Sequence, residues 1–321
     1  MNELLLSNGV IALLFAETIL FVLISVTFVG ALSIYKHWNF ESLTASQYLL
    51  EKKNYFTTTV LLFILGVKFI LLPVFANIVD GLAEIVPGAM CGAGVINANE
   101  YGMPIFFLKL LVLFLGICWM IINSIDLENN YLHTRRKYEL FFGIYLLLAS
   151  EFLLQILFFT HISLEVPAAC CSVIYGASDS GSTLPFSFNT ATLSALFGIV
   201  TSMLIVTLLN KEKNLSFVLG GLFLYFGYYF VLHVVGIYIY ELPTHICPFC
   251  MLQKEYFYIG YLLWGSLFLG AFFAMAPFVL EGLIHQKSPR SFYVAILFNL
   301  LLVIISAYFI LGFYFKNGVW L

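Results

Sequence analysis

Residues 292–315, FYVAILFNLLLVIISAYFILGFYF, contain no charged side chain and decide the class of protein. A bilayer core is about 30 Å thick and an α-helix rises about 1.5 Å per residue, so about 20 apolar residues cross it. Similar stretches recur along the whole chain. We expect about eight membrane-spanning helices, at residues 9–35, 56–77, 104–125, 140–162, 191–210, 215–240, 257–281 and 292–315.

The overall composition agrees with this interpretation. The 321-residue chain is 62% hydrophobic and 10% charged, whereas soluble domains carry about 25% charged residues. The connections between the expected helices are short, so we expect one polytopic, all-α membrane domain over residues 1–321, without a soluble domain. The first stretch lacks a basic n-region and carries Glu17, which argues against a signal peptide. The net charge of −3 argues against a nucleic-acid partner; the expected surroundings are a lipid bilayer.

The basic residues predict the orientation. Short cytoplasmic loops of membrane proteins carry an excess of Lys and Arg. Of the 14 basic residues, most fall in alternate connections, namely Lys36, Lys52, Lys53, Arg135, Arg136, Lys137, Lys211, Lys213, Lys287 and Arg290. With an even number of helices, this places both termini outside.

The cysteines gather on the opposite, outer side. Cys91, Cys170, Cys171, Cys247 and Cys250 all fall in outside connections, and only Cys118 lies within an expected helix. An outside location permits disulfides. An odd number of outside cysteines leaves at least one that is free, metal-bound or exchanging.

Three outside connections share a motif. They read EIVPGAMC (84–91), LEVPAACC (164–171) and YELPTHIC (240–247), each with an acidic residue, a proline, and a cysteine four positions after the proline. This pattern indicates an internal repeat of helical hairpins, formed by helices 2–3, 4–5 and 6–7. Proline is expected to end each outgoing helix, and Cys91, Cys171 and Cys247 to converge. The alternative is that the proline–cysteine spacing recurs by chance or only reflects how such loops pack.

The pair Cys247 and Cys250 forms a C-x-x-C, which has three interpretations. At a helix start, such a pair forms an exchangeable disulfide, and the helix dipole lowers the thiol pKa. Two such thiolates also bind one metal ion. In the third interpretation, the two cysteines are unpaired and have no chemical role. His245 is expected to assist, by lowering a thiol pKa or as a ligand.

Residues 247–264, CPFCMLQKEYFYIGYLLW, resemble the DsbB family, membrane enzymes that pass electrons from periplasmic thiols to quinone. The resemblance implies quinone contacts at Gln253 and Lys254, although the family has arginine at the second position. Residues 91–111, CGAGVINANEYGMPIFFLKLL, resemble the loop and helix start of vitamin K epoxide reductase homologues. In this chain the loop cysteines precede the C-x-x-C, as in the epoxide reductases. The adjacent pair Cys170 and Cys171 rarely closes on itself and offers sulfurs to other partners.

Ionisable residues within the expected helices are costly in a bilayer and are functional candidates. They are Glu17, Lys68, Lys109, Glu151 and His233. The carboxylates and ammoniums form either structural ion pairs, or a proton path or polar pocket. His161 is expected to cap a helix end.

Together these features predict a thiol–disulfide oxidoreductase of the bacterial cytoplasmic (inner) membrane, with its cysteines on the periplasmic side and a quinone as cofactor. Its partner would be a periplasmic thiol protein. The alternative is a copper protein that holds Cu(I) through Cys91, Cys171, Cys247 and His245, with Met90 and Met251 nearby. Such a protein would transport copper or help to mature a metalloenzyme, with a periplasmic copper protein as its partner. A second alternative is an accessory subunit of a respiratory or electron-transfer system, whose cysteines only staple its loops.

Overall fold

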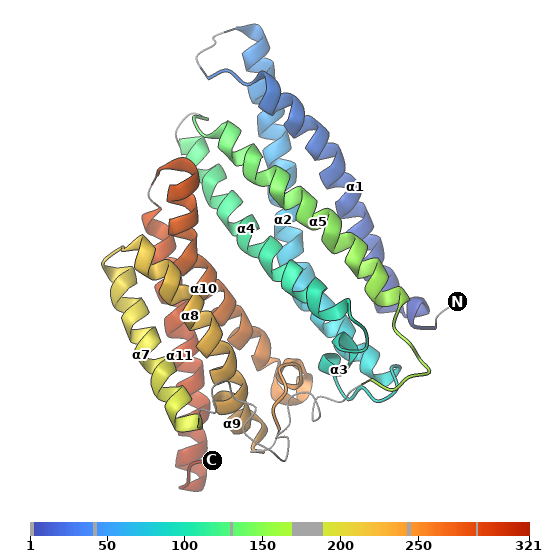
Figure 1. The fold of residues 1–321 in the computed structure, drawn as a ribbon, viewed down its shortest axis with the longest axis vertical. Helices are drawn as coiled ribbons and strands as arrows, with labels where there is room; N and C mark the ends of the chain where they lie inside the picture. The colour runs from blue at the N-terminus through green and yellow to red at the C-terminus, as the bar shows by residue number, and fades with distance from the viewer. Residues whose placement is uncertain (1–2, 41–43, 129–130, 169–188, 243–244, 287) are drawn as a thin grey trace. The chain divides into compact units, whose positions relative to one another are not determined.

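The computed structural model describes residues 3–40, 44–128, 131–168, 189–242, 245–286 and 288–321, and these contain helices but no strand. Figure 1 shows the helices α1 (Asn8–His37), α2 (Ala45–Gly81), α3 (Gly92–Ile96), α4 (Gly102–Glu128), α5 (Thr134–Thr160), α7 (Thr190–Leu209), α8 (Lys213–Phe230), α9 (Gly236–Tyr240), α10 (Ile259–Ile284) and α11 (Pro289–Asn317). A π-helical turn, Val231–Val235, joins α8 to α9. Within the described residues, eight helices are long and apolar enough to cross a membrane, counting α8 to α9 as one. This confirms the all-α, multi-pass fold.

The start of helix α2 differs from the start of the apolar stretch that predicted it. Helix α2 begins at Ala45 rather than near residue 56, because the Thr44 hydroxyl accepts the Gln47 N–H at 3.4 Å and caps a polar first segment. Lys52 and Lys53 therefore lie on a helix, not in a loop.

Two of the three prolines of the recurring motif, Pro87 and Pro167, do not end the helices, contrary to expectation, and the third, Pro243, lies outside the described residues. Helix α2 ends at Gly81, before Pro87, and α5 ends at Thr160, before Pro167. At the end of α5 the His161 Nδ1 lies 2.9 Å from the Leu157 carbonyl oxygen. This side chain caps the helix, as predicted for His161. Both prolines lie in the loops that follow these helices.

The chain divides into two compact units. Unit 1 comprises Met1–Val79 and Ile96–Leu164, and unit 2 comprises Asp80–Val95 and Glu165–Leu321. Both units are built from membrane-length helices.

Unit 1 packs α1 against α5 and α5 against α4. Aromatic rings fill the contact between α1 and α5: Phe28 stacks on Tyr145 with ring centroids 4.2 Å apart, and Phe21 stacks on Phe152 at 4.7 Å. Offset stacking of this kind adds about 0.5–1.5 kcal/mol per pair beyond simple burial.

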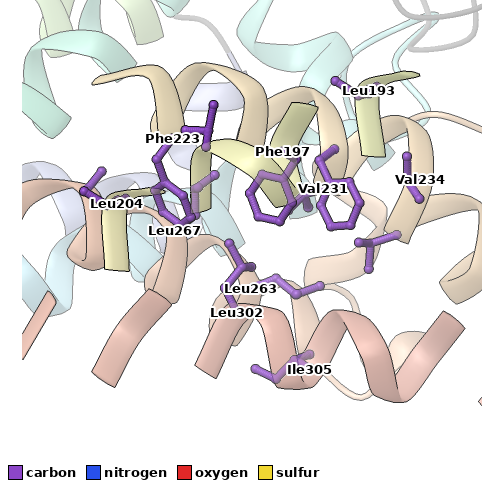
Figure 2. Packing of buried hydrophobic residues seen from close by; sticks show 14 of the residues in the cluster. Leu193, Phe197, Leu204, Phe223, Val231, Val234, Leu263, Leu267, Leu302 and Ile305 are labelled. Carbon is purple, nitrogen blue, oxygen red and sulfur yellow. The ribbon is translucent and has the colours of Figure 1, made fainter. Parts of the chain in front are cut away.

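Unit 2 packs α8 against both α7 and α10, and α10 against α11. Phe197 of α7 stacks on Phe230 of α8 at 4.2 Å and on Phe223 at 5.6 Å. Figure 2 shows this cluster, which also contains Leu267 of α10 and Leu302 of α11.

Candidate thiol site

Three thiols come together in unit 2. The Sγ atoms of Cys91, Cys247 and Cys250 all lie within 4.8 Å of one another, and those of Cys91 and Cys247 are 3.3 Å apart. Cys91 and Cys247 are fully buried, whereas Cys250 is partly exposed. Cysteines of the first and third motifs thus converge, as the recurring pattern predicts. The other two predicted site cysteines, Cys170 and Cys171, lie outside the described residues.

Asp80 holds the two cysteine-bearing segments together. Its Oδ1 accepts the Gly92 N–H at 2.8 Å, next to Cys91, and its Oδ2 accepts the Gln253 side-chain N–H at 2.9 Å, just beyond Cys250. Hydrogen bonds to a charged acceptor are about twice as strong as neutral ones. Sequence reasoning missed Asp80; the available signal was an acidic residue in the last turn of an apolar helix.

The same two segments touch directly at Gly92. A Cβ atom at this position would lie 2.6 Å from Cδ1 of Phe249, the residue between Pro248 and Cys250 in the C-x-x-C. Real Cβ contacts are not this short, so only glycine lets the aromatic ring pack here. The close approach brings Cys91 to the C-x-x-C.

The C-x-x-C turn is fastened to neighbouring helices through its backbone. The Tyr240 hydroxyl donates to the Cys247 carbonyl and accepts the Met251 N–H at 3.1 Å. The Trp264 indole N–H donates to the Pro248 carbonyl at 3.1 Å. These bonds fix the backbone of the turn that carries Cys247 and Cys250.

The C-x-x-C does not begin a membrane helix, contrary to expectation. Cys250 starts a short 3₁₀ turn that ends at Leu252, and α10 begins only at Ile259. Phe257 and Tyr258 adopt left-handed backbone conformations, with φ of 54° and 58°, and separate the two elements. The dipole of a long helix therefore does not act on these thiols.

The first two copies of the motif also touch. The Ala168 N–H donates to the Pro87 carbonyl at 2.7 Å. Gly88 has φ of 79°, and a Cβ there would lie 2.6 Å from the Ala168 carbonyl oxygen. Glycine is required at this turn both for its left-handed backbone and for the space.

No family model, no curated protein and no solved structure matches the chain.

The predicted accessory residues occupy different surroundings. The His245 ring packs edge-to-face on Tyr240 with centroids 4.5 Å apart, and its Nε2 is buried without a hydrogen-bond partner. Among the described residues, the cluster of potential metal ligands within 4.8 Å of one another consists of the three thiols. His245 does not belong to it. The Lys254 side chain is 78% exposed and lies 3.9 Å from Glu255. Met90 is 75% exposed, whereas Met251 is fully buried.

Tyr256 borders the site through Tyr240, with ring centroids 4.9 Å apart. Burial raises the pKa of the Tyr256 phenol, and the negative charges of Cys250 and Glu255 raise it further. The phenol therefore stays protonated beside the cysteines at neutral pH and can donate a hydrogen bond.

The charged residues expected inside the membrane divide between the units. Glu17, Lys68, Lys109 and Glu151 meet within unit 1 and form ion pairs, which was one of the two alternatives for these residues. His233 lies in the π-helical turn of unit 2, 8% exposed, with its ring 6.1 Å from that of Tyr229.

Proposed function

We propose that the protein is a membrane thiol–disulfide oxidoreductase that passes electrons from thiols outside the membrane to a quinone. The observation that carries the proposal is the 3.3 Å separation between Cys91 Sγ and Cys247 Sγ, beside a third thiol, Cys250. Thiol–disulfide exchange involves three sulfurs, namely the attacking, the central and the leaving one. The site holds this number of sulfurs within 4.8 Å of one another.

The proposed exchange keeps atoms and electrons balanced. The Cys247–Cys250 dithiol loses two electrons and two protons as it closes to a disulfide, and the quinone takes up both to become a quinol. The Cys91 thiolate then attacks Cys247 Sγ, forming a Cys91–Cys247 disulfide and releasing Cys250 as a thiolate. A second thiol attacks Cys91 and releases Cys247; we assign this role to Cys170 or Cys171.

Burial supports this order of events. Cys250 is the partly exposed residue of the three, whereas Cys91 and Cys247 are buried, so we assign the contact with the quinone to Cys250. We propose that Gln253, Lys254 and His245 line the quinone side of the site. Gln253 is already oriented by Asp80, and the exposed ammonium of Lys254 can approach a quinone oxygen.

The proposal includes a location. The Lys and Arg residues concentrated in alternate connections and in the helix ends beside them favour an orientation with both termini and the cysteine loops outside. We propose a bacterial inner membrane with the thiols facing the periplasm, where disulfides persist. The electron donor would be a periplasmic thiol protein.

Copper binding is the second candidate, because three sulfurs within 4.8 Å of one another form a soft ligand set suited to Cu(I). Two sulfurs at 2.3 Å from one tetrahedral metal lie about 3.8 Å apart. The Cys91 and Cys247 sulfurs, 3.3 Å apart, suit direct exchange as well, so disulfide mapping together with metal analysis distinguishes the two candidates.

Disulfide mapping tests the exchange. The reduced full-length protein is oxidised anaerobically with diamide, and its linked peptides are identified by mass spectrometry, with bound copper and zinc measured on the same sample. We expect both Cys247–Cys250 and Cys91–Cys247 disulfides, and accumulation of the second in Cys250→Ser. Cys118→Ser is the matched control, since this buried thiol lies in α4 of unit 1. Stoichiometric metal without either disulfide would favour the copper candidate.

A further inference from the structure

Unit 1 contains a closed ring of four charged side chains. Lys68 Nζ lies 2.5 Å from Glu17 Oε2 and 2.9 Å from Glu151 Oε1. Lys109 Nζ lies 3.2 Å from Glu17 Oε1 and 2.6 Å from Glu151 Oε1. Each ammonium thus contacts both carboxylates, and the ring has no net charge.

The ring lies deep within the helices. All four side chains are at most 7% exposed. At a rise of 1.5 Å per residue they lie roughly 10–20 Å from the nearer ends of α1, α2, α4 and α5. Charged groups at such depth are tolerated only when they pair, and they commonly mark proton relays or substrate paths.

A count of donors and acceptors shows that the ring is incomplete. An ammonium has three N–H donors. Those of Lys109 go to Glu17, Glu151 and the Gln155 side-chain oxygen, the last at 2.8 Å. Lys68 donates to two carboxylates and keeps one donor. Glu151 Oε2 is buried and has no hydrogen-bond partner.

A small cavity adjoins both unfinished groups. It is lined by Lys68 and Glu151, together with Glu17, Lys109, Leu71, Leu72 and Leu113, and leaves about 10 Å³ for the centre of a water molecule. That is about the space that one buried water needs. An unpartnered carboxylate oxygen in an apolar interior is costly, and a bound water removes this cost.

We propose that one water molecule binds in this cavity, accepts the third N–H of Lys68, donates to Glu151 Oε2, and makes these two residues a proton-exchange site. A proton passes from Lys68 to the water while the water gives its own proton to Glu151. The products are a neutral amine and a neutral carboxylic acid, and the reverse transfer restores the ion pair. The ring keeps its zero net charge throughout, so no uncompensated charge forms in the low-dielectric interior.

This inference is independent of the proposed thiol chemistry. Every residue of the ring and its cavity lies in unit 1, whereas Cys91, Cys247 and Cys250 lie in unit 2. Either proposal therefore stands or fails without the other.

Two measurements on the full-length protein in nanodiscs test the site. A high-resolution cryo-electron microscopy map is expected to show one isolated density between Lys68 and Glu151. Hydrogen–deuterium exchange of the Lys68 ammonium is followed by NMR with ¹⁵N-lysine, and its signal is assigned by its absence from a Lys68→Arg protein.

The variant Leu72→Phe fills the cavity while leaving all four charges in place. We expect the Lys68 exchange rate to fall at least tenfold in this variant, because the water route is closed. Leu62→Phe is the matched control, since Leu62 is 38% exposed on the same helix and does not line the cavity. Glu151→Gln, which removes the proton acceptor, is expected to slow the exchange as well.

A map with no density in the cavity would overturn the water site. An unchanged Lys68 exchange rate in both Leu72→Phe and Glu151→Gln would overturn the proton-exchange role and leave the ring as a structural ion-pair network.

Discussion

The variant Gly92→Ala adds a single methyl group where the two cysteine-bearing segments meet. Its Cβ would lie 2.6 Å and 2.9 Å from two ring carbons of Phe249, and 3.2 Å from Asp80 Cα. Carbon atoms normally rest about 3.5–4.0 Å apart, so the overlap with the ring is about 1 Å. The Asp80 contact is with backbone, which leaves Phe249 as the group that must move.

The cost of this overlap is that of overpacking a core, about 1–3 kcal/mol. Phe249 lies within the C-x-x-C, so its displacement carries Cys247 away from Cys91. A penalty of this size lowers the population with the two sulfurs in contact by about 5- to 150-fold. We therefore expect the Cys91–Cys247 disulfide yield under mild oxidation to fall by a factor in this range.

The assay is quantitative mass spectrometry of the Cys91–Cys247 peptide in the Cys250→Ser background, with and without Gly92→Ala. Gly221→Ala is the control, because nothing lies within 4 Å of a Cβ at that position in unit 2. A wild-type disulfide yield in Gly92→Ala would refute the argument that this contact positions the thiols.

Three further predictions follow from named contacts. Asp80→Ala removes the acceptor shared by both cysteine-bearing segments and is expected to lower the yield of the Cys91–Cys247 disulfide at least fivefold. An unchanged yield in Asp80→Ala would show that packing alone holds the two segments together. Glu17→Gln leaves a net charge in the buried ring and is expected to destabilise unit 1 by about 3–5 kcal/mol. Glu17→Gln combined with Lys68→Met restores neutrality and is expected to cost less. Unfolding in mixed detergent measures the stability of both variants, and a double variant less stable than Glu17→Gln would contradict the charge balance of the ring. Tyr256 has a raised pKa, mainly from burial and then from Cys250, so its phenol favours the folded state in the neutral form and its contribution to stability is present below about pH 10 and lost above it. In Cys250→Ser the pKa of Tyr256 is expected to fall in a ¹³C-tyrosine NMR titration, and an unshifted titration would argue against the proximity of the thiolate.

The membrane-spanning helices were predictable because a bilayer imposes a simple requirement of length and apolarity. The stretch at 292–315 needed no tertiary information, and α11 covers it fully. The polar start of α2 was not predictable in this way, since Thr44 and its helix cap lie outside the apolar window.

Part of the thiol site was also predictable. The repeated proline–cysteine spacing correctly brought Cys91 and Cys247 together. The fit of the Phe249 ring onto Gly92 was not predictable, because a close approach of distant segments leaves no local signal. The helix start expected at the C-x-x-C was wrong because Phe257 and Tyr258 adopt left-handed conformations that are usually the role of glycine or asparagine.

The buried charged residues were predictable only in part. Glu and Lys residues within the apolar stretches left ion pairs as one of two alternatives, and the structure contains these pairs. The closure of the ring and the unpartnered oxygen of Glu151 depend on side-chain geometry and required the structure.

Quinone-dependent thiol oxidation tests the central claim most directly. The reduced full-length protein is mixed anaerobically with a ubiquinone or menaquinone analogue, and free thiols and quinol are counted together, with Cys250→Ser alongside. The account predicts two thiols lost for each quinone reduced, and no reduction by the variant. Thiols that persist in excess quinone, or disulfides that form equally without it, would contradict the account.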